Sequence, residues 1–501
     1  MKTEFYSEIN SEVLDHCGKI IRDGGLVCFP TETVYGLGAD AFNPEAVNSV
    51  YEAKGRPHDN PLIVHISELS EAESVTAMTE VERERFGKMA EAFWPGPLTM
   101  IVTKKDTVPE EVSCGLKTVG VRLPSHTVAR DFIKAAGTPI AAPSANSSGR
   151  PSPTLASHVM EDLEGKVDAI IDGGSCQVGL ESTVIDLTGE VPCILRPGGI
   201  TLEMAKKVLP DCTQLEWKEE EISAEEKIAP KSPGLKYKHY APKAKTVILQ
   251  GEPPKVAERI HWALENAEKR GVKAAAMVSS ELKECFTVEN VVALGSRNDG
   301  EAQAAALFKV LRDFDAQGIE EVYAEAMPED GVGFAVMNRM YRAAGCKMLP
   351  VRYVEFVCTG NTCRSFMAEY ILRSMLEKRM ADGDIEAVAI KVSSSGVFAD
   401  AGCAGSQMAE EVLHIEYDID GRGHRARAFT YDIGEKADVI LCMTEGHKLA
   451  ILRCFPEFES KVFTLGEYGN GQDVQDPFAG SYMTYSRCAD QIRSLIENGI
   501  F

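Results

Sequence analysis

The sequence predicts an α/β protein made of several domains, and three observations favour that class. The chain has 501 residues, which corresponds to about three domains of ordinary size. Over residues 1–212, short apolar runs alternate with turns rich in glycine, proline and serine, as in a mixed α/β domain. Near the other end, a strand-like run at 353–357 precedes a helix-like pattern that begins at Ser365. We therefore expect alternating strands and helices in more than one domain.

Changes in composition divide the chain into four segments. The first, residues 1–212, holds the apolar runs of the mixed α/β domain, at 26–29, 61–66, 98–102, 118–123 and 140–142. Residues 213–243 are first acidic and then broken by proline and glycine, which indicates a linker. Residues 244–350 contain a strand-like run at 246–249 and helical patterns at 254–269 and 301–316, which predict a small, Rossmann-like α/β domain. Residues 351–501 form the last domain.

The composition also limits the classes of function. An apolar content of 44% and a charged content of 26% are ordinary for globular proteins. The first eight residues lack the apolar core of a signal peptide, and no run approaches membrane-spanning length, so we expect a cytoplasmic protein without a membrane partner. Fourteen cysteines without paired metal-ligand spacing fit free thiols in a reducing compartment. A net charge of −23 argues against tight direct binding of nucleic acid.

The most informative stretch is Cys358-Thr359-Gly360-Asn361-Thr362-Cys363-Arg364-Ser365, which lies between the strand-like run and the helix-like pattern. A loop in this place can turn its backbone N–H groups around one phosphate, and Gly360 is expected to permit the tight path. The same field would hold Cys358 as a thiolate, and the Arg364 guanidinium can contact two phosphate oxygens. The stretch therefore predicts transfer of a phosphoryl group to sulfur.

Such a transfer needs an acid for the leaving group, and Asp476-Pro477-Phe478 supplies a carboxylate in a turn. Alone, an Asp-Pro pair is more typical of a surface turn. The loop, the chain order and the separation of 118 positions (476 minus 358) together resemble the low-molecular-weight protein tyrosine phosphatase family over residues 352–501. The resemblance implies a parallel sheet flanked by helices and a phosphorylated protein substrate. It also implies that Cys358 is the nucleophile, Arg364 the transition-state clamp, Ser365 the support of the thiolate, and Asp476 the general acid and then base.

The residues of the phosphate loop bear on specificity. Thr362 occupies a position where tyrosine-specific members generally carry an apolar residue, and the loop including Asn361 resembles the protein-arginine phosphatase branch; tyrosine specificity is the alternative. Cys363 is either a second thiol that traps oxidised Cys358 as a disulfide or a small packing residue. Phe366 replaces the usual proline and residues 393–396 replace a usual Ser-Ala-Gly, so the resemblance predicts the chemistry more closely than the shape of the pocket.

A second set of polar residues is scattered through the N-terminal segment. Its fragments pair strand ends with hydroxyl groups or cations, as in ligand pockets of α/β sheets, and lie at 30–38, 54–57, 60–65, 118–122, 143–146, 181–183 and 195–198. Individually each has an ordinary explanation: Lys54 and Arg56 as a solvated helix end, His65 as a core histidine, Ser144 and Asn146 as a turn. The glycines at 36–38 imitate a dinucleotide fingerprint without its acidic partner, so they do not predict nicotinamide binding.

Together these fragments resemble the YrdC domain of the threonylcarbamoyl-AMP synthases over residues 20–200, and the following chain to about 350, including 331–339, resembles the extra domain of two-domain members. The resemblance implies an enzyme that joins L-threonine, bicarbonate and ATP into threonylcarbamoyl-AMP with release of pyrophosphate. ATP is expected to bring Mg²⁺, with no metal ligand from the protein alone and no organic cofactor. The product would supply the downstream tRNA threonylcarbamoyl transfer machinery.

The chemistry assigns candidate roles within this segment. Cations must neutralise the departing pyrophosphate, and the candidates are Lys54, Arg56 and Arg196. Threonine needs partners for its hydroxyl and carboxylate groups, and the candidates are Thr31, His65, Arg122 and Ser182. The remaining candidates for the nucleotide are His58, Thr118, Ser144, Asn146 and Ser152. By the resemblance, Tyr237 and His239 in the linker close over the pocket and exclude water.

The whole chain is therefore expected to be a bifunctional enzyme, a synthase followed by a phosphatase. Two alternatives from other classes stay open. The N-terminal part can be an RNA-binding module without catalysis, which the acidic charge disfavours. The C-terminal part can be a phosphoprotein sensor, which the retained thiol and acid disfavour.

Overall fold

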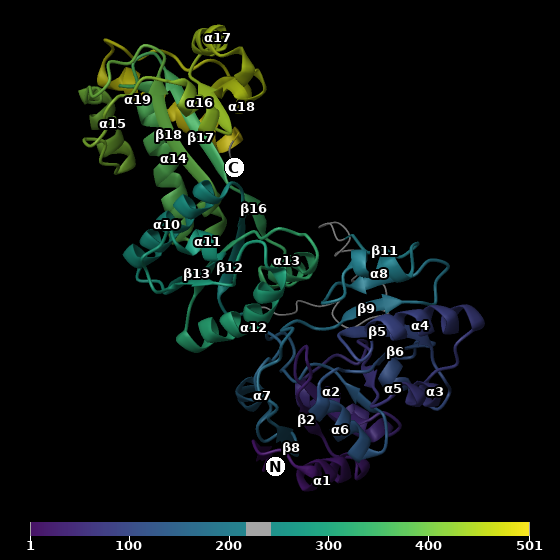
Figure 1. Cartoon of the computed structure of the whole chain (residues 1–501). Coiled ribbons are helices and arrows are strands. Elements are labelled where there is room, and N and C mark those ends of the chain that lie inside the picture. Colours follow the sequence, from purple (N-terminus) through teal and green to yellow (C-terminus); the bar gives the residue numbers. More distant parts are fainter. Residues whose placement is uncertain (1, 217–241, 500–501) are drawn as a thin grey trace. The chain divides into compact units, whose positions relative to one another are not determined.

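The structure of the chain is a computed structural model, and it describes residues 2–216 and 242–499 (Figure 1). Tyr237 and His239, and with them most of the predicted linker, lie outside the described residues. The chain divides into two compact units. The first contains residues 1–248 and 273–348, and the second contains residues 249–272 and 349–501.

The first unit is built on a mixed sheet of eleven strands in the order β1-β8-β2-β3-β7-β4-β6-β5-β9-β10-β11. The strands are β1 (Glu4–Tyr6), β2 (Val27–Phe29), β3 (Gly36–Asp40), β4 (Ile63–His65), β5 (Leu98–Thr103), β6 (Thr118–Arg122), β7 (Ile140–Ala142), β8 (Ala169–Ile171), β9 (Thr183–Asp186), β10 (Cys193–Arg196) and β11 (Thr213–Gln214). Each of the five predicted apolar runs coincides with one of these strands to within a few residues. Parallel and antiparallel pairs alternate irregularly, and the predicted mixed α/β class is confirmed.

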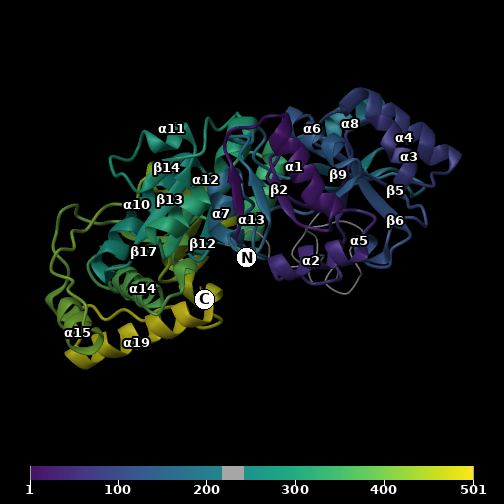
Figure 2. The same ribbon diagram turned by 90° about the horizontal axis from the view of Figure 1, so that it is seen from below.

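Helices cover this sheet. They are α1 (Ser11–Arg22), α2 (Pro44–Lys54), α3 (Ala72–Val75), α4 (Glu80–Phe93), α5 (Glu110–Ser113), α6 (Thr127–Ala136), α7 (Ala156–Leu163) and α8 (Leu202–Val208), with one 3-10 turn, η1 (Leu69–Glu71). Helices α1 and α6 lie side by side (Figures 1 and 2) and bury apolar residues such as Ile21 and Phe132 against Phe29 of the sheet. The side chain of Asn10 caps α1 by accepting from the Val13 N–H at 3.0 Å.

The two glycines that imitate a dinucleotide fingerprint are part of a strand. Gly36 and Gly38 lie in β3, which pairs antiparallel with β2. A Cβ atom on Gly38 would come within 2.7 Å of Ile140 Cγ2. The second glycine therefore permits close packing between the strand and its neighbours, and it does not form a phosphate-binding turn.

Residues 245–350 form a separate sheet of five strands in the order β14-β13-β15-β12-β16. The strands are β12 (Lys245–Gln250), β13 (Ala274–Val278), β14 (Val291–Ala293), β15 (Glu321–Glu325) and β16 (Met348–Pro350), and the helices are α10 (Pro253–Arg270), α11 (Ser280–Lys283), α12 (Gly300–Gln317) and α13 (Val332–Ala343). Helices α10 and α12 confirm the two predicted helical patterns to within one residue at each end.

The second unit contains a parallel sheet of four strands in the order β18-β17-β19-β20. The strands are β17 (Arg352–Cys358), β18 (Ile390–Gly396), β19 (Val439–Cys442) and β20 (Val462–Thr464). The helices are α14 (Arg364–Ala381), α15 (Gln407–Tyr417), α16 (Tyr431–Lys436), α17 (Glu445–Cys454), α18 (Leu465–Tyr468) and α19 (Tyr482–Gly499), with 3-10 turns η2 (Ile385–Ala389) and η3 (Pro456–Lys461). Helix α14 packs beside α19 (Figure 2), and the predicted parallel sheet with flanking helices is confirmed.

Helix α10 belongs to this second unit. Its Arg259 is buried and donates from Nε to the Val388 carbonyl of η2 at 2.7 Å. The preceding residue, Glu258, forms an ion pair with Lys391 and accepts a hydrogen bond from the Tyr353 hydroxyl at 2.5 Å. The helix is therefore tied to β17, β18 and η2 by polar contacts as well as by packing.

Every cysteine of the chain is a free thiol in the structure, as the sequence predicted. Six of the fourteen are exposed or half-buried, and Cys358 and Cys363 are both buried. Among the described helices, none is both long enough and apolar enough to cross a lipid bilayer.

Candidate functional sites

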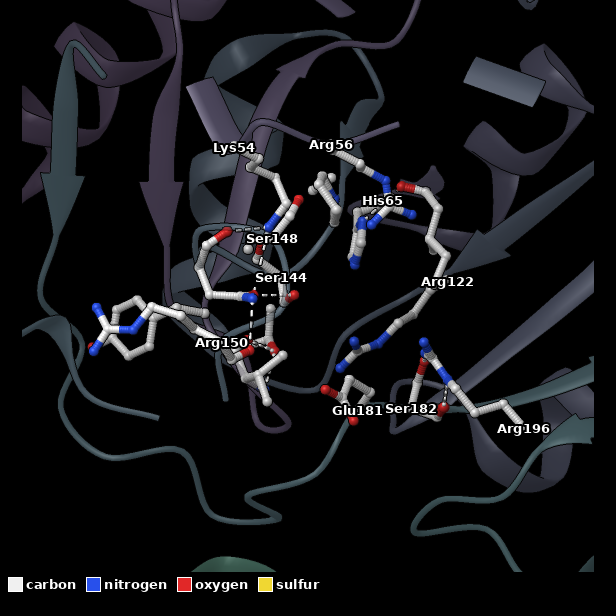
Figure 3. Close-up of a pocket in the computed structure, with 18 of the residues that line it drawn as sticks. Lys54, Arg56, His65, Arg122, Ser144, Ser148, Arg150, Glu181, Ser182 and Arg196 are labelled. Atoms are coloured by element: carbon white, nitrogen blue, oxygen red, sulfur yellow. Dashed lines mark hydrogen bonds between the residues drawn. The ribbon is translucent and has the colours of Figure 1, made fainter. Parts of the chain in front are cut away.

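One pocket in the first unit gathers polar side chains from many strand ends (Figure 3). It encloses about 730 Å³ of space not filled by atoms, including solvent at its mouth. Nine of the residues named from the sequence line it: Thr31, Lys54, Arg56, His65, Arg122, Ser144, Asn146, Ser182 and Arg196. They come from segments far apart in the chain, so the sheet is what brings them together.

Lys54 is the last residue of α2, and its ammonium group lies on the loop that follows β7. Nζ donates to the carbonyl oxygen of Ser144 at 2.5 Å and to that of Asn146. Burial of the side chain lowers the pKa of Lys54 well below its usual value, and the nearby Arg56 charge adds to that effect. The lysine thus fixes the loop and places a desolvated cation at the pocket wall.

The Thr31 side chain organises the turn after β2. Its Oγ1 donates to the Val34 carbonyl at 2.6 Å and accepts from the Thr33 and Val34 N–H groups, each at 3.2 Å. These bonds form a compact turn that keeps the hydroxyl at the pocket.

Arg122 and His65 lie on the neighbouring strands β6 and β4, where they are register partners. Arg122 Nη2 lies 2.8 Å from the Glu32 carboxylate, and both side chains are buried. Burial lowers the pKa of His65 to about 3, and the Arg122 charge contributes. His65 Nδ1 lies 3.1 Å from the Ile63 carbonyl, so this nitrogen carries the proton of a neutral ring.

Ser182 and Arg196 contact each other at the pocket wall. Arg196 donates from Nε to the Ser182 carbonyl and from Nη2 to Ser182 Oγ, both at 3.1 Å. The serine hydroxyl also lies 2.8 Å from Thr99 Oγ1. Both side chains are thereby held in fixed positions at the wall.

Three candidates for the nucleotide do not line this pocket. His58 stacks on Tyr51 with ring centroids 4.6 Å apart. Thr118 begins β6 and lines a smaller neighbouring cavity, and Ser152 donates to the buried Glu181 carboxylate. Ser152 therefore acts on a lining residue without lining the pocket itself.

Sequence reasoning missed several lining residues, among them Ser148, Gly149, Arg150 and Glu181. The signal for the first three was their position directly after the fragment at 143–146. Glu181 was quoted in a fragment, but its function was assigned to its neighbour Ser182. Figure 3 shows the Arg150 and Glu181 side chains beside those predicted.

The loop after β17 in the second unit surrounds the thiol of Cys358. The Asn361 N–H donates to Cys358 Sγ at 3.2 Å, and Ser365 Oγ donates to the same sulfur at 3.0 Å. The following helix α14 begins at Arg364, so its N-terminal end faces the loop. Two donors therefore point at the sulfur, and a helix terminus lies beside it.

The expectation that Gly360 provides the tight path of the loop was wrong. The left-handed residue is Asn361, with φ of 53°, and a Cβ atom on Gly360 would meet only Thr362 Oγ1, at 3.6 Å. Asparagine tolerates this conformation because its side chain forms local hydrogen bonds. Here Nδ2 donates to Ser365 Oγ at 3.0 Å and Ser394 Oγ at 2.8 Å.

The two residues predicted to act on either side of the phosphate contact each other. Arg364 Nη2 lies 2.9 Å from Asp476 Oδ2, and Nη1 donates to the Val474 carbonyl at 3.4 Å. The Arg364 side chain is buried, whereas that of Asp476 is 55% exposed. The Arg364 guanidinium is therefore held in the protein interior, and the Asp476 carboxylate contacts it from the solvent side.

Phe366 stands where the resemblance led us to expect proline, and the structure supplies the reason. Its ring stacks on His424 with centroids 4.2 Å apart. Two glycines leave room for it, since a Cβ atom on Gly405 or Gly421 would come within 2.7 Å of the ring. His424 Nε2 donates to the Asn361 carbonyl at 2.7 Å, so this packing supports the phosphate loop.

The substituted serines at 393–395 also support the loop. Ser394 Oγ accepts from Asn361 Nδ2 and donates to the Glu369 carboxylate at 2.6 Å.

Cys363 is buried with its Sγ 3.4 Å from the Tyr485 hydroxyl, and Thr362 Oγ1 lies 3.7 Å from the same sulfur. The structure thus gives Cys363 a packing partner, and its redox role stays a prediction.

Comparison with known families assigns most of the chain. Residues 19–198 match the Sua5/YciO/YrdC model, which is described as telomere recombination. Residues 200–345 match the model of the threonylcarbamoyl-AMP synthase C-terminal domain. Residues 353–499 match the model of the low molecular weight phosphotyrosine protein phosphatases.

Individual relatives agree with these matches. Threonylcarbamoyl-AMP synthase of Pyrococcus abyssi is 43% identical over 331 residues, which are 66% of this chain and 94% of the relative. The synthase of Bacillus subtilis is 41% identical over 341 residues, 68% of this chain and 95% of the relative. The crystal structure of P. abyssi Sua5 complexed with L-threonine is 41% identical, covers 70% of this chain and 100% of that one, and superposes with a TM-score of 0.64. The chain therefore belongs to the threonylcarbamoyl-AMP synthase family, and residues 353–499 add a low molecular weight phosphatase domain.

Proposed function

We propose that this chain is a bifunctional enzyme that makes threonylcarbamoyl-AMP in its first unit and removes phosphate from arginine residues of proteins in its second. The observation that carries the first activity is the single pocket that gathers Thr31, Lys54, Ser144 and Ser182. The relationship to P. abyssi Sua5, which is known in complex with L-threonine, supports the choice of amino acid. The product would be used by the tRNA threonylcarbamoyl transfer machinery.

The reaction joins three substrates in sequence. The threonine amine attacks bicarbonate to give a carbamate with loss of water, and a carbamate oxygen then attacks the α-phosphorus of MgATP. The bond from the α-phosphorus to its bridging oxygen breaks, and pyrophosphate leaves with the electron pair. Lys54, Arg56 and Arg196 line the pocket and would balance the negative charge that develops on pyrophosphate.

Threonine would lie on the side of the pocket formed by β4, β6 and the segment before β9. Arg122 offers a buried guanidinium whose Nε has no hydrogen-bond partner among the described residues, and this nitrogen suits a carboxylate. The neutral imidazole of His65 and the hydroxyls of Thr31 and Ser182 would distinguish the threonine hydroxyl from an apolar side chain.

A full-chain assay tests the synthase. ATP, L-threonine and bicarbonate are supplied together and singly omitted, while pyrophosphate is measured and threonylcarbamoyl-AMP is identified by mass spectrometry. We expect both products only with all three substrates. Tight RNA binding without pyrophosphate formation would instead favour an RNA-binding module, the alternative from another class.

The second unit would act by covalent catalysis. The Cys358 thiolate attacks phosphorus, the bond from phosphorus to the leaving atom breaks, and Asp476 protonates that atom. Water, deprotonated by Asp476, then attacks the cysteinyl phosphate, which releases inorganic phosphate and restores the thiolate. Arg364 would contact the equatorial phosphate oxygens once the phosphoryl group competes with Asp476 for its guanidinium.

Specificity for phosphoarginine rests on Thr362. Its hydroxyl lies in the phosphate loop, where it offers a polar partner for the leaving guanidinium in place of an apolar contact with a phenyl ring. The ratio of kcat/KM for phosphoarginine to that for phosphotyrosine, measured on the full chain, tests this choice. We expect the ratio to fall in Thr362→Ile and in the nearly isosteric Thr362→Val, and to be retained in Thr362→Ser; an unchanged ratio in all three would reject the assignment.

A further inference from the structure

Two buried arginines of the first unit extend from helices α12 and α13, here called the α12–α13 layer, to the loops of the synthase pocket. Arg312 of α12 and Arg339 of α13 have side chains exposed by 1% and 0%. Arg312 forms an ion pair with Asp162 and Arg339 one with Glu181, and both carboxylates belong to residues 1–212. Neither arginine lines the pocket itself.

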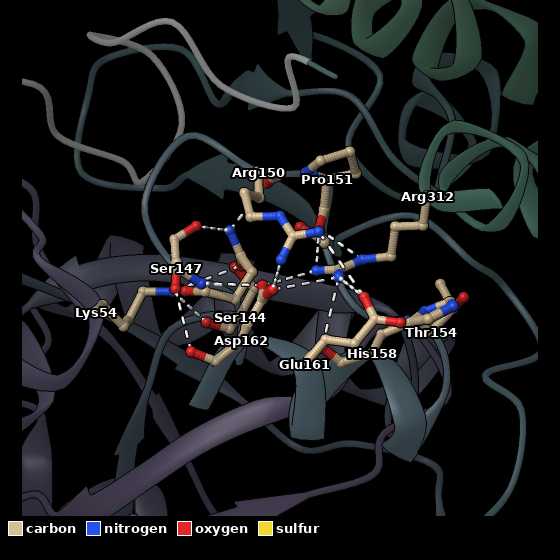
Figure 4. A network of polar contacts seen from close by, with 12 residues as sticks. Lys54, Ser144, Ser147, Arg150, Pro151, Thr154, His158, Glu161, Asp162 and Arg312 are labelled. Atoms are coloured by element: carbon tan, nitrogen blue, oxygen red, sulfur yellow. Dashed lines mark hydrogen bonds and ion pairs between the residues drawn. The ribbon is translucent and has the colours of Figure 1, made fainter. Parts of the chain in front are cut away.

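Arg312 uses most of its donors on one small region (Figure 4). Nη2 donates to the Pro151 carbonyl at 2.6 Å and to Asp162 Oδ2 at 2.8 Å, and Nε donates again to the Pro151 carbonyl at 3.1 Å. Nη1 lies 3.4 Å from the His158 carbonyl and 3.4 Å from Asp162 Oδ1. The guanidinium therefore fixes both the chain at 151 and the carboxylate on α7.

Asp162 connects Arg312 to the loop at 147–150, which lines the pocket. Its side chain is fully buried and accepts from the Ser147 N–H at 3.1 Å, and it forms an ion pair with Arg150. Arg150 lines the pocket, and so do the neighbouring residues Ser148 and Gly149. The same loop is held from its other end by Lys54, as Figure 4 shows.

Arg339 makes an equivalent connection on the other side. Its Nε lies 2.9 Å from Glu181 Oε2, and its Nη2 donates to the Pro197 carbonyl at 3.0 Å. These two contacts are adjacent in sequence to Ser182 and Arg196, which line the pocket. Burial raises the pKa of Glu181, but the Arg339 and Arg196 charges outweigh it and lower the pKa, so the carboxylate stays ionised.

Stability alone does not explain these contacts between helices α12 and α13 and residues 1–212. A buried ion pair gains little over well-packed apolar residues, because both charges lose their hydration. Planar guanidinium groups with several directed hydrogen bonds do, however, set the position of loops more strictly than apolar packing does.

We infer that Arg312 and Arg339 are positioning residues of the synthase: Arg312 holds the 147–150 loop for ATP, and Arg339 holds the segments at 181 and 197 for threonine and pyrophosphate. The inference rests on the synthase activity proposed above. It makes the α12–α13 layer part of the machinery that shapes the pocket.

The test compares full-chain variants by steady-state kinetics and thermal unfolding. Arg312→Met is expected to raise KM for ATP by roughly tenfold and to leave KM for threonine within about twofold, because a small displacement of a binding loop has effects of this size. Arg339→Met is expected to raise KM for threonine by more than KM for ATP and also to slow pyrophosphate release, because it holds the segments of Ser182 and Arg196. Arg312→Lys keeps the charge without the planar fork and should recover only part of the loss.

Two controls separate positioning from general loss of stability. Arg259→Met removes another buried arginine, in the second unit, and should leave both synthase KM values unchanged. Phosphatase turnover of each variant reports whether the second unit is intact. If Arg312→Met does not fold, Asp162→Asn, which retains shape and weakens the same contact, takes its place with the same expected rise in KM for ATP.

The outcomes are distinguishable. A wild-type chain that forms no threonylcarbamoyl-AMP would refute the proposed function rather than the role of the arginines. An active wild type whose Arg312 and Arg339 variants lose only thermal stability, with both KM values and kcat unchanged at a temperature where they are folded, would overturn the inference. A uniform loss of kcat without any change in the ratio of the two KM values would also overturn it.

Discussion

Arg364 Nη2 and Asp476 Oδ2 are 2.9 Å apart, so the two groups proposed to act on opposite parts of a phosphoryl group are each other's ion-pair partner. The arginine is buried and further fixed by the Val474 carbonyl, whereas the carboxylate is largely exposed. A phosphoryl group that enters the loop would draw the arginine's charge away from the carboxylate. Asp476 would then be released for proton transfer only when substrate is present.

The first prediction concerns that pair. Asp476→Asn keeps a hydrogen-bonding group beside Arg364 but removes the proton donor, so we expect kcat of the phosphatase to fall by about 10²–10⁴. Cys358→Ser should abolish turnover. Both variants should form threonylcarbamoyl-AMP at the wild-type rate; loss of both activities in Cys358→Ser would contradict two independent sites. Phosphate release and pyrophosphate release, measured on the same preparations, provide the comparison.

The second prediction concerns Lys54. Its ammonium group is desolvated at the pocket wall, and the negative charge of ATP would stabilise it. Lys54→Ala should therefore slow pyrophosphate release by about 10²-fold or more while KM for threonine changes little. Single-turnover kinetics separate the two effects. An unchanged rate of pyrophosphate release would remove Lys54 from the chemistry.

The third prediction follows from the same residue. Burial lowers the pKa of Lys54 in the pocket, and bound phosphates would raise it again, so ATP binding should take up protons at a pH between the pKa values of the free and the ATP-bound protein. Calorimetric titration with ATP in two buffers of different ionisation enthalpy measures this uptake. The uptake should decrease in Lys54→Met, and equal uptake by wild type and variant would assign the protons to another group.

The fourth prediction concerns pH and stability. Burial lowers the pKa of His447 to about 4, with a contribution from the Arg364 charge, and its ring nitrogens lie 2.8 Å from Thr359 Oγ1 and Thr444 Oγ1. The unfolded chain binds a proton at this residue near pH 6.5 and the folded chain only near pH 4, so the free energy of unfolding should decrease as pH falls through that interval.

His447→Gln should reduce that pH dependence by up to about 1.4 kcal/mol per pH unit. Urea unfolding of wild type and variant at pH 5 and pH 7 gives the double difference, in which contributions of His65 and His158 cancel. Parallel stability curves for the two proteins would exclude His447 as the source.

The fifth prediction concerns the space for Phe366. Gly421→Ala would place a methyl group within 2.7 Å of the ring, and we expect a loss of about 1–3 kcal/mol in the free energy of unfolding. Gly423→Ala is the matched control, because a Cβ atom there meets no other atom within 4 Å. Phe366→Leu combined with Gly421→Ala should recover part of the loss. Equal stability of the two alanine variants would show that the ring moves without cost.

Local patterns predicted much of this molecule. The unit from β17 through the phosphate loop to α14 is contiguous in sequence, and Cys358 and Arg364 could be placed on it from the strand, glycine, hydroxyl and helix around them, while the role of Ser365 came from the resemblance. The N-terminal pocket was predictable where a polar residue follows an apolar run, as at His65 and Arg122. Assignment of the reaction depended on the family resemblance, because no local pattern specifies a carbamate.

The missed features depend on contacts between distant segments. Nothing near Phe366 in the sequence shows that Gly405 and Gly421 leave room for it. The left-handed residue in the loop is Asn361 because its amide bonds to Ser394, on another strand. His58 and Thr118 were placed at the nucleotide by their motifs, while the structure stacks one on Tyr51 and directs the other to a separate cavity.

Helix α10 falls within residues 200–345, which match the synthase C-terminal domain, yet it is part of the compact unit that contains the phosphatase sheet. By sequence this stretch of chain belongs to the synthase C-terminal domain, and by its contacts it belongs to the second unit. A phosphatase domain produced from residue 351 onward would lack Arg259 and Glu258, and the Val388 carbonyl and Lys391 would lose those partners. The second unit therefore keeps these contacts only while it stays joined to residues 253–270.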